Sequence, residues 1–224
     1  FVGLIWLNVR QPETLPISDR KKLKAVEYLK AFKFVITNFS VVKYTLTLAL
    51  SFGALFGYLS SAQQIFVDTF SAGSRFPIYF AIISILAAPA SFINAMLVMK
   101  LGMRFLATVG FALQIIFALC VLLILNTSIF SDQLFLLIFI IWSILAFFLK
   151  GLYIGNLNAL AMEPMGAIAG MASAIIGASA TMIGILIAIF IGLAFQGTAT
   201  PVLLGYIICS AAALFLMLSQ SKTN

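Results

Sequence analysis

Downstream of Lys43 the sequence contains six apolar runs, each long enough to cross a lipid bilayer as a helix. A spanning helix needs about 20 residues, because it rises about 1.5 Å per residue through a hydrocarbon layer about 30 Å thick. Only 8% of the chain is charged and 63% is hydrophobic, whereas soluble domains carry about 25% charged residues. We therefore predict an all-α integral membrane protein whose bundle, residues 44–218, contains six transmembrane helices at 44–67, 76–99, 103–125, 133–155, 167–195 and 200–218.

A shorter apolar stretch, residues 1–9, stands before Arg10. As a helix it would reach only about 13 Å, which is too short to cross the hydrocarbon layer. It also has neither the basic start nor the small-residue cleavage site of a signal peptide. We interpret it as the end of a truncated transmembrane helix, a seventh helix that precedes the six-helix bundle.

Basic residues concentrate in the segment 10–43, which holds eight of the thirteen lysines and arginines of the chain. In a membrane protein such a cluster marks a cytoplasmic loop rather than a nucleic-acid site. Alternating spans place Lys100, Arg104, Glu163 and the tail 219–224 on the same side as this loop. We therefore expect a basic cytoplasmic inter-domain loop at 10–43 and cytoplasmic positions for both ends of the chain.

Part of this loop, residues 19–33, has the pattern of an amphipathic helix. Its apolar face is formed by Leu23, Val26, Leu29 and Phe32, and lysines surround the remainder. A basic amphipathic helix suits the membrane surface. Two interpretations remain open: a helix that couples or regulates two domains, or a positively charged linker that sets the topology.

Residues that support enzymatic chemistry are scarce. The chain has no histidine, and its two cysteines, Cys120 and Cys209, both lie within apolar runs. No acidic pair or nucleophile–base set is recognisable, and no aspartate or glutamate falls at the middle of a predicted span. We expect no enzyme activity, no cofactor and no metal site.

Polar residues inside the spans are the candidates for function, because they are costly in lipid. Tyr58, Ser60 and Ser61 either line a cavity for an amphiphilic molecule or lie at the interface at a helix end. Lys150, followed by Tyr153, is either a buried counter-ion or a lysine whose long side chain reaches the interface.

Other residues of the spans are expected to shape the bundle. Asn94 and Gln114 are predicted to form hydrogen bonds between helices, and Pro89 to bend its helix. A line of small residues is predicted to form a close helix-packing seam along the fifth span: Gly170, Ala174, Gly177, Thr181, Gly184 and Ala188.

Four short motifs give the chain a resemblance to a known family. They are PETLP at 12–16, LFGYLS at 55–60, KLGMR at 100–104 and NLNALAMEP at 156–164. With these motifs the sequence resembles the C-terminal half of a major facilitator superfamily transporter. More narrowly, it is similar to the bicyclomycin-resistance (Bcr/CflA) branch of drug:proton antiporters.

The resemblance implies two six-helix halves around a central cavity, with residues 1–9 ending the last helix of the other half. It implies a bacterial inner-membrane exporter of small drug-like amphiphilic compounds in exchange for protons, of the kind that confers antibiotic resistance. Its partners would be lipid, the missing N-terminal half, a small organic substrate and protons. The substrate cavity would include Tyr58, Ser60, Ser61, Lys150 and Tyr153, and the proton-binding carboxylate would belong to the missing half. The alternative is a non-transporting membrane scaffold derived from half of a carrier.

Overall fold

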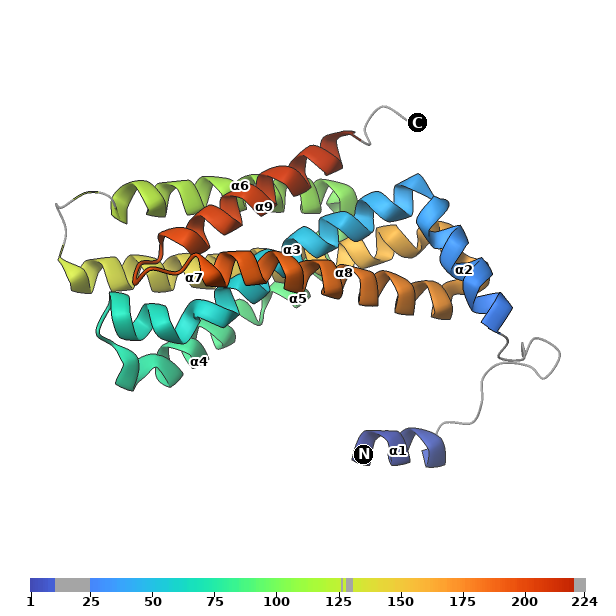
Figure 1. Ribbon diagram of the computed structural model, residues 1–224, viewed down its shortest axis with the longest axis horizontal. Helices are drawn as coiled ribbons and strands as arrows, with labels where there is room; N and C mark the ends of the chain where they lie inside the picture. The colour runs from blue at the N-terminus through green and yellow to red at the C-terminus, as the bar shows by residue number, and fades with distance from the viewer. Residues whose placement is uncertain (11–24, 126, 128–130, 220–224) are drawn as a thin grey trace.

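The computed structural model describes residues 1–10, 25–125, 127 and 131–219 (Figure 1). Helices account for almost all of this part of the chain, and no strand occurs in it. The α-helices are α1 (Val2–Arg10), α2 (Ala25–Thr37), α3 (Phe39–Gln64), α4 (Phe76–Ala87), α5 (Ala90–Leu101), α6 (Met103–Leu125), α7 (Asp132–Met162), α8 (Ala169–Leu193) and α9 (Thr200–Ser219). A π-helical turn (Ile65–Thr69) extends α3, and short 3-10 segments precede α4 (Gly73–Arg75) and α8 (Glu163–Ile168).

Within the described residues, six helical stretches are long and apolar enough to cross a membrane, which confirms the predicted all-α membrane bundle. Their bounds follow the predicted spans, with two extensions. The first span begins at Phe39, ahead of residue 44, because the side chain of Asn38 accepts a hydrogen bond from the Val41 amide (3.2 Å) and caps the helix there. The fourth continues past Gly155 to Met162.

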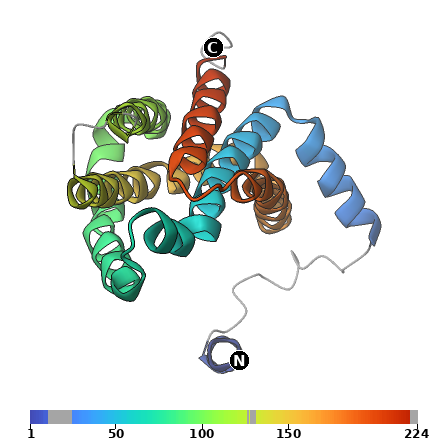
Figure 2. The same ribbon diagram turned by 60° about the vertical axis from the view of Figure 1, so that its left-hand side comes forward.

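The bundle is built around α3, which packs against α7, α8 and α9. Helix α6 packs against α7 and α9, whereas α4 and α5 cover another face of α7 (Figures 1 and 2). Helix α1 stands apart from the bundle, as both views show. Its interpretation as the end of a transmembrane helix stays a prediction.

The two ends of the bundle agree with the predicted alternation of loops. At one end, Lys43 donates a hydrogen bond to the Ser219 hydroxyl (3.0 Å), and Arg104 donates one to the Met217 carbonyl (3.0 Å). We name this the Lys43 end. At the opposite end, Thr69 donates a hydrogen bond to the Gly197 carbonyl (2.9 Å). Which end faces the cytoplasm stays a prediction, and the tail beyond Ser219 lies outside the described residues.

Helix α2 forms within the predicted amphipathic segment, although the part of that segment before Ala25 lies outside the described residues. Ala31 and Val35 are buried against the bundle. The predicted apolar face points outward instead, with Val26, Leu29 and Phe32 all exposed. The helix is therefore apolar on two sides, one packed against the bundle and the other exposed.

Pro89 interrupts the second span, as predicted. Helix α4 ends at Ala87 and α5 begins at Ala90. Proline has no backbone N–H and its ring crowds the preceding turn, so the α-helical hydrogen-bond pattern breaks at this point. Gly151 on α7 allows α5 to pack closely against α7, because any side chain there would collide with Ala90: a Cβ built at Gly151 would lie 2.6 Å from the Cβ of Ala90.

Asn94 forms the predicted interhelical bond, whereas Gln114 does not. Asn94 on α5 and Asn156 on α7 exchange hydrogen bonds through their amides, at 2.8 and 3.3 Å. Gln114 is also buried, but neither polar atom of its side chain has a hydrogen-bond partner in the described part of the chain. The hydrogen bond between helices predicted for Gln114 is therefore not formed in this structure.

The Asn94–Asn156 pair is expected to couple α5 to α7. In a double-mutant cycle of Asn94→Leu and Asn156→Leu, the unfolding free energy in mixed micelles should show a coupling of about 0.6–1.7 kcal/mol. Asn158, which is exposed on the same helix, serves as the control. Asn158→Leu combined with Asn94→Leu should give no coupling, and equal coupling in both cycles would contradict a specific amide pair.

The predicted small-residue seam on α8 is correct over only part of its length. Gly184 and Ala188 are buried against α3, but Gly170 and Ala174 are exposed. The buried stripe consists instead of Ala172, Ile176, Ala180, Gly184, Ala188 and Ile191. This stripe steps mostly by four residues, as the ridge rows of closely crossing helices do, whereas the predicted seam alternates steps of four and three and turns away from α3.

Candidate functional site

The apolar interior of the bundle is divided into two clusters, and a polar layer lies between them. Along α3 one cluster ends at Ala49 and the other begins at Ala54. Along α7 they are separated between Ala146 and Leu149. The buried polar residues Ser51, Lys150 and Ser210 occupy this level on α3, α7 and α9. We refer to these three residues as the polar layer.

Lys150 is the centre of the polar layer and is only 4% exposed. Its Nζ donates a hydrogen bond to the backbone carbonyl of Ser51 at 2.9 Å. It also lies 3.5 Å from the Ser51 hydroxyl and 3.5 Å from the Tyr153 hydroxyl. Two aromatic faces complete its surroundings, since Nζ lies 4.8 Å from the ring centre of Tyr206 and 5.9 Å from that of Tyr153.

The alternative in which Lys150 extends to the membrane interface is wrong. Helix α7 runs from Asp132 to Met162, so Lys150 lies well inside the helix rather than near its end. The side chain turns inward to α3 and α9 instead of following α7 outward.

No carboxylate neutralises Lys150 within the described residues. Asp68, Asp132 and Glu163 all lie at helix ends, in the π-helical turn, the first turn of α7 and the 3-10 segment after α7. Removing an amino group from water without a counter-ion is costly. The energetic demand at this position is therefore met by a carbonyl, hydroxyl groups and aromatic rings alone.

Tyr153 lies beside the polar layer, with its hydroxyl next to the Lys150 amino group. It is fully buried, with its ring against Phe111 of α6 at 4.4 Å between ring centres. A Cβ built at Gly110 would lie 2.6 Å from the Tyr153 ring, so this glycine makes the space that the ring occupies. The structure thus brings Lys150 and Tyr153 together, as the sequence suggested.

Tyr58 and Ser61 do not line an open cavity in this conformation. Tyr58 is fully buried, contacts the Ser143 hydroxyl at 3.0 Å and packs among the rings of Phe139, Trp142, Phe147 and Tyr206. Ser61 is also fully buried. In this conformation they belong to an aromatic cluster, because α7 and α9 pack against α3 and enclose them; their role in a substrate cavity stays a prediction.

Ser60 lies apart from this cluster. Its hydroxyl bonds the Gly57 carbonyl at 2.9 Å, and it faces Gly192 of α8, where a Cβ would lie 3.1 Å from that hydroxyl. Lys150, one of the predicted cavity residues, lines a hollow between α5 and α7. This hollow, about 390 Å³ in volume, is bordered by Ser91, Asn94, Lys150, Gly151, Ile154 and Gly155.

Three buried polar atoms in the aromatic cluster have no hydrogen-bond partner in the described part of the chain. They are the Ser61 hydroxyl, the Trp142 indole N–H and the Tyr206 hydroxyl. Most buried polar groups in folded proteins are paired, so three unpaired ones in one aromatic cluster are unusual. The aromatic cluster and the surroundings of Lys150 share one residue, Tyr206, whose ring face contacts Lys150.

Sequence reasoning missed Ser51 and Tyr206, which contact Lys150 directly. Ser51 could have been found as a small polar residue inside an apolar span. Tyr206 could have been found as an aromatic residue with a polar group in the last span. Neither signal says which residues on other helices stand at the same depth.

Comparison with known proteins identifies no relative. No protein-family model matches the sequence, and the searches of curated proteins and of solved structures return no match. The site is therefore interpreted from its own geometry.

Proposed function

We propose that this chain is one half of a secondary active transporter that exports small amphiphilic compounds in exchange for protons. The resemblance of its four motifs to the bicyclomycin-resistance branch motivates the substrate class and the direction of transport. We further propose that the chain lies in a bacterial inner membrane with the Lys43 end in the cytoplasm, because basic residues such as Lys43 and Arg104 lie at that end.

The buried Lys150, with no carboxylate beside it among the described residues, is the observation that supports this proposal most. An ionisable side chain inside a membrane bundle is rare and costly, and such residues mark substrate or ion pathways. A structural contact between α3, α7 and α9 would be made more cheaply by an apolar residue. Lys150 and the unpaired groups near it would meet an amphiphilic compound if α3 and α7 separated.

A partner half fits the exposed part of α8. Gly170 and Ala174 are exposed, and nothing lies within 4 Å of a Cβ built at Gly170 or Gly177. Small residues on a membrane helix allow another helix to approach closely. The scaffold alternative would use the same surface, so transport itself has to separate the two functions.

The test is a transport assay in liposomes that contain this chain together with the six-helix half that the resemblance implies. A fluorescent amphiphilic compound without a positive charge should be exported when a proton gradient is imposed, and a protonophore should abolish export. The chain reconstituted alone should not export.

Each contrary outcome has a definite meaning. Export by the chain alone would contradict the half-transporter proposal. Export that persists with the protonophore would contradict proton exchange. No export by the two halves together, although they co-purify, would favour the scaffold.

A further inference from the structure

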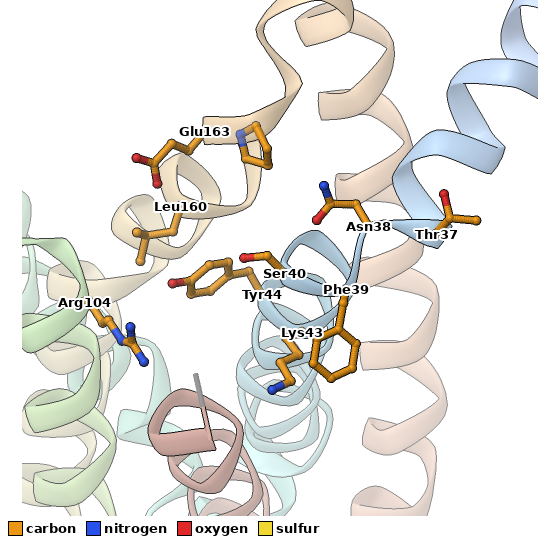
Figure 3. Close-up of a pocket in the computed structure, with 10 residues that line it drawn as sticks. Thr37, Asn38, Phe39, Ser40, Lys43, Tyr44, Arg104, Leu160 and Glu163 are labelled. Carbon is orange, nitrogen blue, oxygen red and sulfur yellow. The ribbon is translucent and has the colours of Figure 1, made fainter. Parts of the chain in front are cut away.

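A polar basin of about 820 Å³ opens at the Lys43 end of the bundle, remote from Lys150. Its walls come from the start of α3, from α6 and from the end of α7 (Figure 3). Its lining includes Asn38, Ser40, Lys43, Tyr44, Arg104 and Glu163. We propose that this basin binds a phosphate-bearing group, either the headgroup of a lipid or a soluble phosphorylated compound.

Two cations face the basin with donors to spare. Lys43 uses one donor on Ser219 and lies 4.3 Å from the ring centre of Phe39. Arg104 uses one donor on the Met217 carbonyl. An ammonium group has three donors and a guanidinium has five, so both can bind a further acceptor. Neither has a carboxylate within ion-pair distance in the described part of the chain, so an anion would be their natural counter-charge.

The start of α3 adds to this positive potential. Asn38 caps the helix through the Val41 amide, and Ser40 of the first turn lines the basin. The helix is 26 residues long, and the positive end of its dipole faces the basin. Oriented backbone N–H groups and a helix dipole together favour a phosphate.

Tyr44 makes this charged region a specific site. Its side chain is only 7% exposed, yet its hydroxyl forms no hydrogen bond within the described residues. Figure 3 shows the hydroxyl pointing toward the wall formed by Arg104 and Glu163. Tyr44 lines the basin, so its hydroxyl is free to donate a hydrogen bond into it, and a phosphate oxygen beside Arg104 would accept that bond.

Glu163, which lines the basin with Arg104, sets the class of ligand. It is exposed and forms no ion pair with another described residue. Its carboxylate repels a doubly charged phosphate more than a singly charged phosphodiester. It would also accept a hydrogen bond from a hydroxyl or amine carried next to the phosphate. The basin should therefore prefer a phosphodiester to inorganic phosphate.

The experiment measures thermal unfolding of the full chain in a sugar-based detergent and phosphate-free buffer. The probes are inorganic phosphate, glycerol 3-phosphate and dihexanoylphosphatidylglycerol, a short-chain lipid with a phosphodiester. At least one should raise the melting temperature in a saturable way. Saturation by the short-chain lipid alone would identify a lipid headgroup, and saturation by glycerol 3-phosphate would identify a soluble compound.

Variants separate a site from general charge attraction. Tyr44→Phe should leave the melting temperature without ligand unchanged and weaken binding by about tenfold, the factor for one hydrogen bond to a charged group. Arg104→Gln should weaken it at least as much, and Glu163→Gln should strengthen binding of inorganic phosphate. Arg75→Gln, at the opposite end of the bundle, is the control and should bind as the wild type does.

Two results would overturn the proposal: no saturable response to any of the three probes, or the same response in Tyr44→Phe as in Arg75→Gln. Because Tyr44→Phe removes only an oxygen atom that has no partner, the test stands even where Arg104→Gln loses the bond to Met217 and fails to fold. The site does not depend on transport, so failure of one proposal leaves the other intact.

Discussion

Replacing Lys150 with methionine is expected to reduce transport by about tenfold or more without weakening the fold. Methionine has a similar length and no polar group, so it fills the space between α3, α7 and α9 while removing the buried amino group. Ser51 lies inside α3, where its carbonyl keeps the hydrogen bond of the helix. The unfolding free energy of Lys150→Met should therefore equal that of the wild type or exceed it by up to about 4 kcal/mol, as for other replacements of buried charged groups.

Export by the two-half transporter should fall by about tenfold or more in this variant, the factor that corresponds to losing about 1.4 kcal/mol of interaction. Lys100→Met is the matched control, because Lys100 is exposed at the end of α5 and carries the same charge. It should retain export and stability. A Lys150→Met protein that unfolds more easily than the wild type would show that the lysine is structural, and the functional proposal would lose its main support.

Gly184→Leu is expected to give the largest loss of stability in the bundle. A Cβ at Gly184 would lie 2.8 Å from the Cβ of Phe52, and 3.2 Å from both the Ala49 carbonyl oxygen and the Gly53 amide. Two of these neighbours are backbone atoms of α3, which cannot rotate away. The substitution must therefore separate α3 from α8, at a cost of about 3 kcal/mol or more in unfolding free energy.

Gly177→Leu on the same helix is the matched control, because nothing lies within 4 Å of a Cβ at that position. For the chain alone, its unfolding free energy should match the wild type or rise slightly, since leucine favours a helix more than glycine does. Chemical denaturation of both variants in mixed micelles would measure the difference. Equal losses at Gly184 and Gly177 would contradict the observed α3–α8 packing. A loss at Gly177 that occurs only with the partner half would instead locate that partner's contact.

The number and approximate positions of the spans follow from the sequence alone, because lipid requires long apolar helices whatever their packing. The break at Pro89 follows as well, since it depends on the chemistry of one residue. The sequence pattern does not predict the start of α3 at Phe39, because Lys43 looks like part of the basic loop although the capped helix runs through it.

The candidate site was only partly predictable, and the reason is geometric. The sequence singles out Lys150 as a cation in an apolar run, but it leaves open whether the side chain turns inward or outward. That choice depends on Ser51 and Tyr206, which are remote along the chain and reach Lys150 only because α3 and α9 pack against α7. The same holds for the seam on α8, where the angle between α3 and α8 decides which glycines are covered.

Six membrane-length apolar helices were thus determined by the sequence itself, since local hydrophobicity and length are sufficient for that conclusion. The tertiary structure alone decided that Lys150 is buried between two apolar clusters and that Tyr44 points without a partner into a basin beside Arg104. Contacts between distant helices depend on how side chains of different spans fit together. A single sequence contains no direct record of that fit.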